Sequence, residues 1–153
     1  MKHDDIELRR ANARDRSEWL RLRIALWPRQ TPAELAAELD KIAVDPMQPA
    51  FVAALPDGRL CGFLEVSIHS EAPGCTTDRI GYLEGWYVDP ALRGRGIGAG
   101  LVALGEAWAR EQGCTEMASD TDGDYPQSPQ AHAALGYGEV HREIFFRKPL
   151  TDE

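Results

Sequence analysis

The residues best suited to chemistry in this 153-residue chain are closely spaced glycines with arginines beside them. They lie in the segment Val88–Gly100, which reads VDPALRGRGIGAG. Glycines let the backbone approach a ligand closely and turn its N–H groups outward. An apolar-periodic segment follows, and the first turn of such a helix has unpaired N–H groups and a partial positive charge that attract phosphate. The pattern predicts a site for a pyrophosphate-bearing ligand.

Other glycine-rich loops fit this segment less well. A P-loop needs Gly-Lys-Ser or Gly-Lys-Thr at its end, and the segment has no lysine. A Rossmann fingerprint can be placed on Gly94, Gly96 and Ala99, but it should open a long parallel sheet, and only 53 residues follow Gly100. A plain turn between a strand and a helix needs one glycine, whereas four occur here within seven residues.

Carboxylates in two predicted strands are candidates for binding an amine. Asp120, Asp122 and Asp124 directly follow a predicted strand, and α/β folds place ligands at such strand ends. Glu84 lies inside an otherwise apolar strand beside Gly85, which favours a bulge or a close approach by another group. A carboxylate there could hold a substrate ammonium and take its proton. The alternative for both sets of acids is a solvated surface.

Composition predicts one globular domain, residues 1–153, without a membrane span. The net charge of −8 argues against nucleic acid as a partner and is compatible with a cationic one. The N-terminal sequence MKHDDIE lacks the apolar region of a signal peptide, so a cytoplasmic location is expected. Cys61, Cys75 and Cys114 are odd in number and lack metal-like spacing, so we expect free thiols and no metal site.

Periodicity and turn residues predict the element order β-α-α-β-β-β-α-β-α-β. One helix should begin at the capping box Thr31-Pro32-Ala33-Glu34, and Pro56–Arg59 should form a hairpin turn. The strands are expected at residues 6–10, 50–55, 60–70, 80–88, 115–119 and 140–148, the last extending back to Tyr137, and the helices at 14–26, 32–43, 98–112 and 128–135.

The loop Arg93-Gly94-Arg95-Gly96-Ile97-Gly98 resembles the Arg/Gln-x-x-Gly-x-Gly/Ala signature of the GCN5-related N-acetyltransferases (GNAT), whose element order is the same. Between about Ile6 and Lys148 the chain resembles one subgroup, the aminoglycoside 6′-N-acetyltransferases. The segments that carry this resemblance are Leu26-Trp27-Pro28, Tyr82–Val88, Met117–Thr121, His132–Tyr137 and Ile144–Lys148. The resemblance implies an α/β GNAT fold, with a single mixed, mostly antiparallel sheet flanked by helices. It also implies acetyl transfer to the 6′-amine of aminoglycosides, antibiotic resistance and a homodimer.

The resemblance also implies where acetyl-CoA binds. Main-chain N–H groups of Trp86, Tyr87 and Val88 would pair with the pantetheine arm, and one would donate to the thioester oxygen. Tyr125 stands where the subgroup usually has an Asn that contacts coenzyme A. The residues implied around the pyrophosphate are Arg93, Gly94, Arg95, Gly96, Ile97, Gly98 and Ala99.

Four residues are implied at the aminoglycoside. Glu84 binds the substrate and is the candidate base, and Asp120 matches an acid that contacts a substrate amine. Trp27 matches a Trp that contacts the antibiotic, although a Trp-Pro pair at a helix end is often a packing feature. His141 stands where relatives often carry a Glu that touches the substrate.

The acid that protonates the leaving thiolate is open between two residues. His132 occupies the place where many relatives outside the subgroup carry a Tyr in that role, and an imidazole can donate near neutral pH. A helix-packing role for His132 and an acid role for Tyr125 are the alternatives. Because no cysteine falls at the predicted reaction centre, we expect direct transfer in a ternary complex.

Two rival functions and one structural question stay open at this stage. The chain could acetylate another cationic amine, such as a polyamine or a peptide N-terminus, or it could be a silent acyl-CoA-binding sensor. The last predicted strand, with Phe145 and Phe146 on opposite faces, could exchange or pair at an edge in a dimer, or it could simply be buried.

Overall fold

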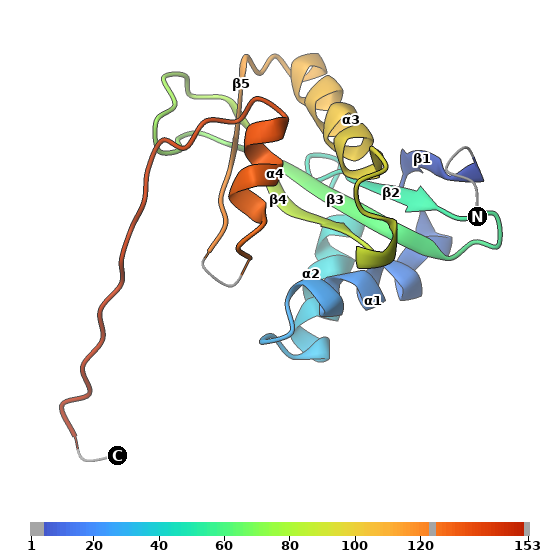
Figure 1. The fold of residues 1–153 in the computed structure, drawn as a ribbon, viewed down its shortest axis with the longest axis horizontal. Helices are drawn as coiled ribbons and strands as arrows, with labels where there is room; N and C mark the ends of the chain where they lie inside the picture. The colour runs from blue at the N-terminus through green and yellow to red at the C-terminus, as the bar shows by residue number, and fades with distance from the viewer. Residues whose placement is uncertain (1–4, 123–124, 152–153) are drawn as a thin grey trace. The chain divides into compact units, whose positions relative to one another are not determined.

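A computed structural model describes residues 5–122 and 125–151 (Figure 1). Contacts divide the chain into two units, Met1–Asp120 and Thr121–Glu153. Asp124, which belongs to the predicted acidic cluster, lies outside the described residues. No helix in the described part of the chain is long and apolar enough to cross a membrane.

The first unit contains a five-stranded sheet in the order β1-β2-β3-β4-β5. The first three pairings are antiparallel and β4 pairs with β5 in parallel, which confirms the predicted mixed, mostly antiparallel sheet. Residues 55–59 form the predicted turn, with Gly58 at φ +90°. The strands are β1 (Glu7–Arg10), β2 (Ala50–Ala54), β3 (Leu60–His69), β4 (Ile80–Val88) and β5 (Glu116–Ser119).

Helices cover both faces of this sheet (Figure 1). Helices α1 (Arg16–Leu26) and α2 (Pro32–Ala43) lie on one face, and α3 (Ile97–Glu111) lies on the other. The hydroxyl of Thr31 accepts the N–H of Glu34 at 3.1 Å, so α2 starts at the predicted cap. Two short 3-10 helices that the sequence did not reveal precede α1 and α3, at Ala13–Asp15 and Pro90–Leu92.

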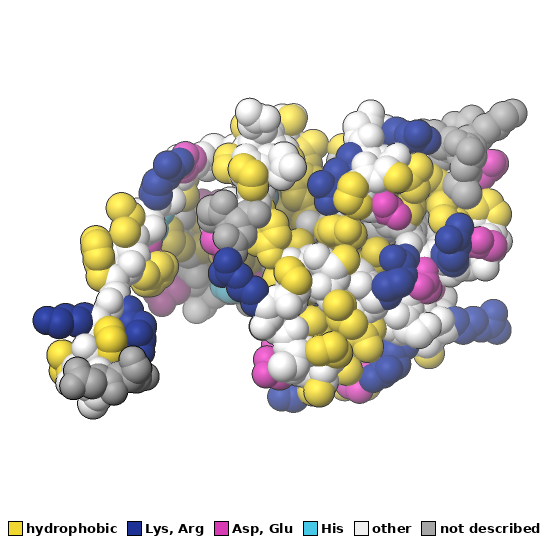
Figure 2. All heavy atoms as spheres, turned by 60° about the horizontal axis from the view of Figure 1, so that its bottom comes forward, with side chains coloured by type: hydrophobic (Ala, Val, Ile, Leu, Met, Phe, Trp, Pro, Cys, Tyr) yellow, Lys and Arg dark blue, Asp and Glu magenta, His cyan; other side chains and the backbone are white. Residues whose placement is uncertain are grey.

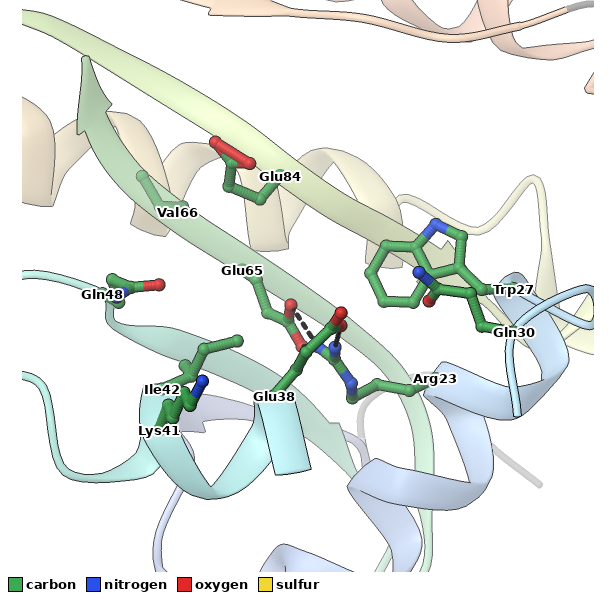
Figure 3. Close-up of a pocket in the computed structure, with 10 residues that line it drawn as sticks. All are labelled: Arg23, Trp27, Gln30, Glu38, Lys41, Ile42, Gln48, Glu65, Val66 and Glu84. Atoms are coloured by element: carbon green, nitrogen blue, oxygen red, sulfur yellow. Dashed lines mark hydrogen bonds and ion pairs between the residues drawn. The ribbon is translucent and has the colours of Figure 1, made fainter. Parts of the chain in front are cut away.

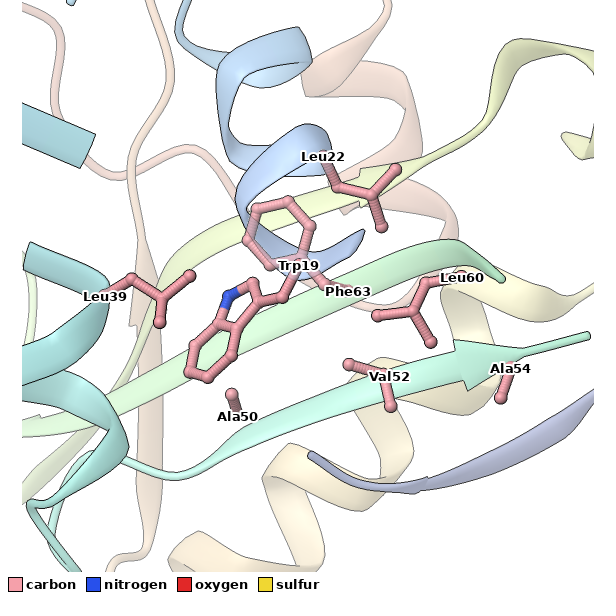
Figure 4. Close-up of a cluster of buried hydrophobic side chains, with 8 residues drawn as sticks. All are labelled: Trp19, Leu22, Leu39, Ala50, Val52, Ala54, Leu60 and Phe63. Carbon is pink, nitrogen blue, oxygen red and sulfur yellow. The ribbon is translucent and has the colours of Figure 1, made fainter. Parts of the chain in front are cut away.

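A cluster of buried side chains joins α1 and α2 to the sheet (Figure 4). Neighbouring strand residues point to opposite faces, so Phe63 packs in this cluster while Leu64 packs near Gly105 of α3. Burying each large apolar side chain contributes roughly 1.5–3 kcal/mol. The cluster contains Trp19, Leu22, Leu39, Ala50, Val52, Ala54, Leu60 and Phe63.

Strand β4 carries a bulge at Glu84. Gly85 pairs with Glu65 of β3, and Leu83 pairs with Val66, so Glu84 is the extra residue on β4. The parallel pairing with β5 ends close by, at Leu83 and Ser119. Strand β4 is therefore paired with β5 up to Leu83, and from Glu84 onward this pairing has ended.

The described part of the second unit contains one helix, α4 (Ser128–Ala134), which is followed by Gly136 at φ +90°. The strand predicted at residues 140–148 is wrong for this structure, in which residues 137–149 carry no helix or strand. Phe145 and Phe146 are 86% and 92% exposed, and Figure 2 shows apolar side chains along this extended segment at the left. The sequence of residues 140–148 has the pattern of a strand, but a strand forms only where a neighbouring strand makes hydrogen bonds to its backbone groups.

Candidate active site

A cavity of about 440 Å³ opens between the α1–α2 layer and strands β3 and β4 (Figure 3). Trp27 and Glu84, which the sequence analysis proposed for substrate binding, both line it. Three of its side chains are carboxylates and two are basic. The lining residues are Arg23, Trp27, Gln30, Glu38, Lys41, Ile42, Gln48, Glu65, Val66 and Glu84.

Trp27 is fixed at the C-terminal end of α1. Its N–H donates to the carbonyl of Arg23 at 2.9 Å, and its ring meets the edge of Phe63 with centroids 6.1 Å apart. A Cβ on Gly85 would come within 2.6 Å of the indole, so only glycine admits Trp27 at this point of β4. Gly85 thus provides the close approach that the sequence predicted, directly beside the Glu84 bulge.

Glu84 is half-exposed and receives two hydrogen bonds from β3. The hydroxyl of Ser67 lies 2.9 Å and Nε2 of His69 lies 2.6 Å from Oε1 of Glu84. The His69 ring stacks on the Tyr82 ring, with centroids 4.0 Å apart. The bulge and these contacts place the carboxylate at the cavity wall (Figure 3).

Asp120 accepts a short hydrogen bond from the hydroxyl of Tyr82. Burial, and then this bond, raises the pKa of the Tyr82 phenol, which therefore stays protonated as the donor. Because Tyr82 also contacts His69, a continuous line of contacts joins Asp120 to Glu84 through the two rings. The two carboxylates proposed for substrate binding thus belong to one polar surface.

A buried ion network forms the floor of the cavity (Figure 3). NH1 of Arg23 lies 2.6 Å from both carboxylate oxygens of Glu65, and NH2 lies 2.6 Å from Oε2 of Glu38. Trp19 donates its indole N–H to Glu65 at 2.8 Å. Burial raises the pKa of Glu65, and its donors Arg23 and Trp19 oppose that shift. This network holds Glu38, which is about half-exposed, at the cavity.

Six polar residues around the site were missed in the sequence: Arg23, Glu38, Glu65, Ser67, His69 and Tyr82. Two signals were available. Arg23 lies four residues after Trp19, on the buried face of α1. Glu65, Ser67 and His69 alternate along β3 and therefore share one face.

The glycine loop has the backbone that a phosphate site requires. Gly94 and Gly96 adopt φ +79° and +84°, and a Cβ at either position would meet no atom within 4 Å. Gly96 caps α3 without a side-chain hydrogen bond, which leaves the first turn of the helix to other acceptors. The indole N–H of Trp86 donates to the carbonyl of Gly98 at 3.2 Å and ties β4 to the loop.

The arginines and the last residues of β4 complete this region. Nε of Arg93 donates to the carbonyl of Val88 at 2.8 Å, and the guanidinium lies 5.4 Å from the centre of the Tyr87 ring. Arg95 is exposed. From Glu84 to Val88, β4 pairs with β3 on one side, and its pairing with β5 on the other side has ended.

The remaining predicted site residues belong to the second unit. The imidazole Nδ1 of His132 lies 2.8 Å from the carbonyl of Ser128, and its ring meets the edge of Tyr137. His141 contacts Glu143 at 2.8 Å, and the N–H of Tyr125 donates to the carbonyl of Asp122. These local contacts do not place the three residues at the cavity, so their proposed roles stay predictions.

The three cysteines are free, as predicted. No group of His, Cys, Asp and Glu side chains among the described residues could hold a metal ion.

Comparison with known proteins identifies the family of this chain. The sequence pattern of the Acetyltransferase (GNAT) family matches residues 15–137. The aminoglycoside N(6′)-acetyltransferase type 1 of Klebsiella aerogenes is 42% identical over 89% of this chain and 91% of its own length. The protein of that name from Stenotrophomonas maltophilia is 39% identical, over 94% and 93%.

Solved structures agree. Aminoglycoside N-acetyltransferase AAC(6′)-Iy in complex with CoA superposes with a TM-score of 0.85 at 35% identity, covering 94% of each chain. The same enzyme with the bisubstrate analogue CoA-S-monomethyl-acetylneamine gives 0.84 at 34% identity, over 94% and 98%. The chain therefore belongs to the acetyltransferase (GNAT) family, beside the aminoglycoside N(6′)-acetyltransferases.

Proposed function

We propose that this protein transfers the acetyl group of acetyl-CoA directly to the 6′-amine of aminoglycosides and thereby confers resistance. The observation that carries this proposal is the cavity that both Trp27 and the bulged Glu84 line, next to the part of β4 that lies beyond its pairing with β5. The relatives that match along nearly the whole chain carry that activity in their names.

The open backbone of the glycine loop fits the pyrophosphate of acetyl-CoA. Gly94 and Gly96 leave space where side chains would stand, and the N-terminus of α3 supplies N–H donors and a favourable dipole. Residues 86–88 would then pair with the pantetheine arm along the part of β4 that lies beyond its pairing with β5. A bound thioester would thus run from the loop toward Glu84.

Amine acylation requires a neutral nucleophile, because an ammonium has no lone pair. Glu84 would hold the substrate ammonium and take its proton, while Asp120 would hold another amine. A main-chain N–H of residues 86–88 would stabilise the oxyanion, and the thiolate would leave after taking a proton from Tyr125 or His132. His141 would also contact the substrate. The acetyl group would pass directly between the two substrates, and no cysteine is among the described residues that line the cavity.

We further propose that both units act as one domain, residues 1–153, in a cytoplasmic homodimer. The family match at residues 15–137 crosses the boundary between the units, which supports one domain. The exposed apolar side chains of Ile144, Phe145 and Phe146 are suited to pair with a second copy. Sedimentation should show a dimer that F146D converts to monomer; a monomeric parent would refute this.

A thiol-release assay across an amine panel tests the function. We expect turnover of kanamycin and tobramycin, resistance to both in a susceptible bacterium, and no resistance to gentamicin C1, whose 6′-nitrogen is secondary. Turnover of spermidine without resistance would instead indicate a different cationic substrate. Bound coenzyme A with no turnover of any amine would indicate a sensor.

A further inference from the structure

The two oxygens of the Glu84 carboxylate have different surroundings. Ser67 and His69 both make their hydrogen bonds to Oε1, at 2.9 and 2.6 Å. Among the residues that the structure describes, none makes a hydrogen bond to Oε2. Since Glu84 lines the cavity, one oxygen is fixed by the protein and the other is available to a ligand.

The His69 imidazole is itself held in place. Its ring lies nearly parallel to the Tyr82 ring, 8° apart, and the Tyr82 hydroxyl is bound to Asp120. His69 and Glu84 are each 38% exposed at the side chain, so water can exchange protons with the imidazole. The ring cannot rotate away from Glu84 without losing its stacking contact.

Through this contact, a charged His69 would compete with a cationic substrate for the negative charge of Glu84. Histidine changes its charge between pH 5 and 8. A protonated imidazole 2.6 Å from Oε1 forms an ion pair that partly neutralises Glu84. A neutral imidazole can keep the hydrogen bond while leaving the negative charge to a ligand.

We propose that His69 is a positioning residue that acts through Glu84: it fixes Oε1, presents Oε2 to the acceptor amine, and weakens substrate binding when it is protonated. The inference rests on the proposed function, in which Glu84 holds the substrate ammonium. The titratable groups around the imidazole are Glu84 and Tyr82 of β4, Asp120 after β5, and Cys75, whose thiol influences Tyr82.

The test compares KM for kanamycin at pH 5.5 and 8 in the parent, H69Q and S67A, with acetyl-CoA saturating. Gln at position 69 can still donate an N–H to Oε1 but carries no charge. At pH 5.5 we expect H69Q to have a KM roughly threefold to fivefold below the parent, the range of a partly exposed ion pair. At pH 8 its KM should lie within about twofold of the parent.

The controls separate the effect of the charge on His69 from the effect of its hydrogen bond to Glu84. S67A removes the other hydrogen bond to Oε1 without removing a titratable group, so its KM ratio to the parent should be the same at both pH values. Introducing H69Q into E84Q should have no pH-dependent effect, because His69 acts through Glu84. The KM for acetyl-CoA in every variant checks that the fold is intact. Titration of the amines of kanamycin is common to all variants and cancels in the ratios.

Two results would overturn this inference in different ways. If the parent acetylates kanamycin and the ratio of KM values for H69Q and the parent is independent of pH, His69 has no such role. If the parent acetylates no aminoglycoside, the proposed function fails and this inference fails with it.

Discussion

Glu84 stands apart from the other carboxylates of the cavity in how it is held. Glu65 is enclosed by Arg23 and Trp19, and Glu38 is paired with Arg23, so both charges are already compensated. Among the described residues, only Ser67 and His69 make hydrogen bonds to Glu84. Of the three carboxylates, it is therefore the one best able to exchange a proton with a ligand.

Replacing Glu84 with Gln should lower kcat/KM for kanamycin by about 10²–10⁴, the usual contribution of a general base. Acetyl-CoA binding, measured by calorimetry, should be retained because the glycine loop is separate in sequence and unchanged. E111Q, at the exposed end of α3, is the matched control and should have parental kinetics. Parental turnover by E84Q across the pH range would remove Glu84 from the mechanism.

Arg23 is 1% exposed, and its Nε has no hydrogen-bond partner among the described residues. Its guanidinium instead lies 4.8 Å from the centre of the Trp27 ring, while its other nitrogens hold Glu38 and Glu65. This one side chain thus positions an aromatic wall and two acids of the cavity.

Replacing Arg23 with Met leaves Glu65 buried without its cation and should cost about 3–5 kcal/mol in the free energy of unfolding. The measurement is urea denaturation followed by circular dichroism. The double variant R23M/E65M removes the uncompensated charge and should be more stable than R23M. A loss below about 1 kcal/mol in R23M would show that the pair does not act as this structure implies.

Among the elements, the start of α3 is the proposed pyrophosphate site, whereas the turn between β2 and β3 only reverses the chain. Both contain a glycine in the left-handed region, Gly96 at φ +84° and Gly58 at φ +90°, and both have open space where a Cβ would stand. These two positions therefore form a matched pair.

G96A and G58A should each cost about 1 kcal/mol of stability, because an L-residue is strained at such φ values. Only G96A should also weaken acetyl-CoA binding, since the backbone at position 96 must turn toward the pyrophosphate. Thermal unfolding and calorimetry on both variants provide the comparison. Equal affinities of G96A and G58A for acetyl-CoA would argue against this loop as the pyrophosphate site.

The junction between β1 and α1 predicts a pH dependence of stability. The guanidinium of Arg9 makes two hydrogen bonds to Asp15, at 2.7 and 2.9 Å, and the N–H of Asn12 adds a third. Burial opposes ionisation of Asp15, but these donors outweigh it and hold the pKa of that carboxyl below its usual range. The ionised form is therefore favoured more in the folded than in the unfolded chain.

The stability from this carboxyl should be present above the unfolded pKa of about 4 and should be lost as the pH falls through the lower folded value. D15N should be less stable than the parent by about 1–3 kcal/mol at pH 7. The difference in the free energy of unfolding should shrink between about pH 4 and pH 2. A difference that is constant over this range would contradict the assignment. D78N is a suitable control, because Asp78 lies in an exposed loop.

At the scale of the whole molecule, local patterns predicted most of the fold. The five strands and four α-helices of the described residues were expected within a few residues of their bounds, because caps, turns and apolar periodicity are encoded within short stretches of chain. The segment 140–148 has the same local pattern but no strand in the structure. Its state depends on a neighbouring strand, which no local pattern specifies.

In the candidate site, likewise, local features could be predicted from the sequence, whereas contacts between distant residues could not. The bulge beside Gly85 and the backbone of Gly94 and Gly96 follow from residue types at single positions. The pairing of Arg23 with Glu65 joins residues that are 42 positions apart, and that of His69 with Glu84 joins residues 15 apart. Such pairs depend on the register of the sheet and the packing of α1, so they appear only in the folded molecule.

The most direct measurement of the central claim is the structure of the product formed from kanamycin and acetyl-CoA, determined by mass spectrometry and NMR. We expect one acetyl group, on the 6′-nitrogen, with equimolar release of coenzyme A. Acetylation at another nitrogen, or no product from an enzyme that binds acetyl-CoA, would contradict it.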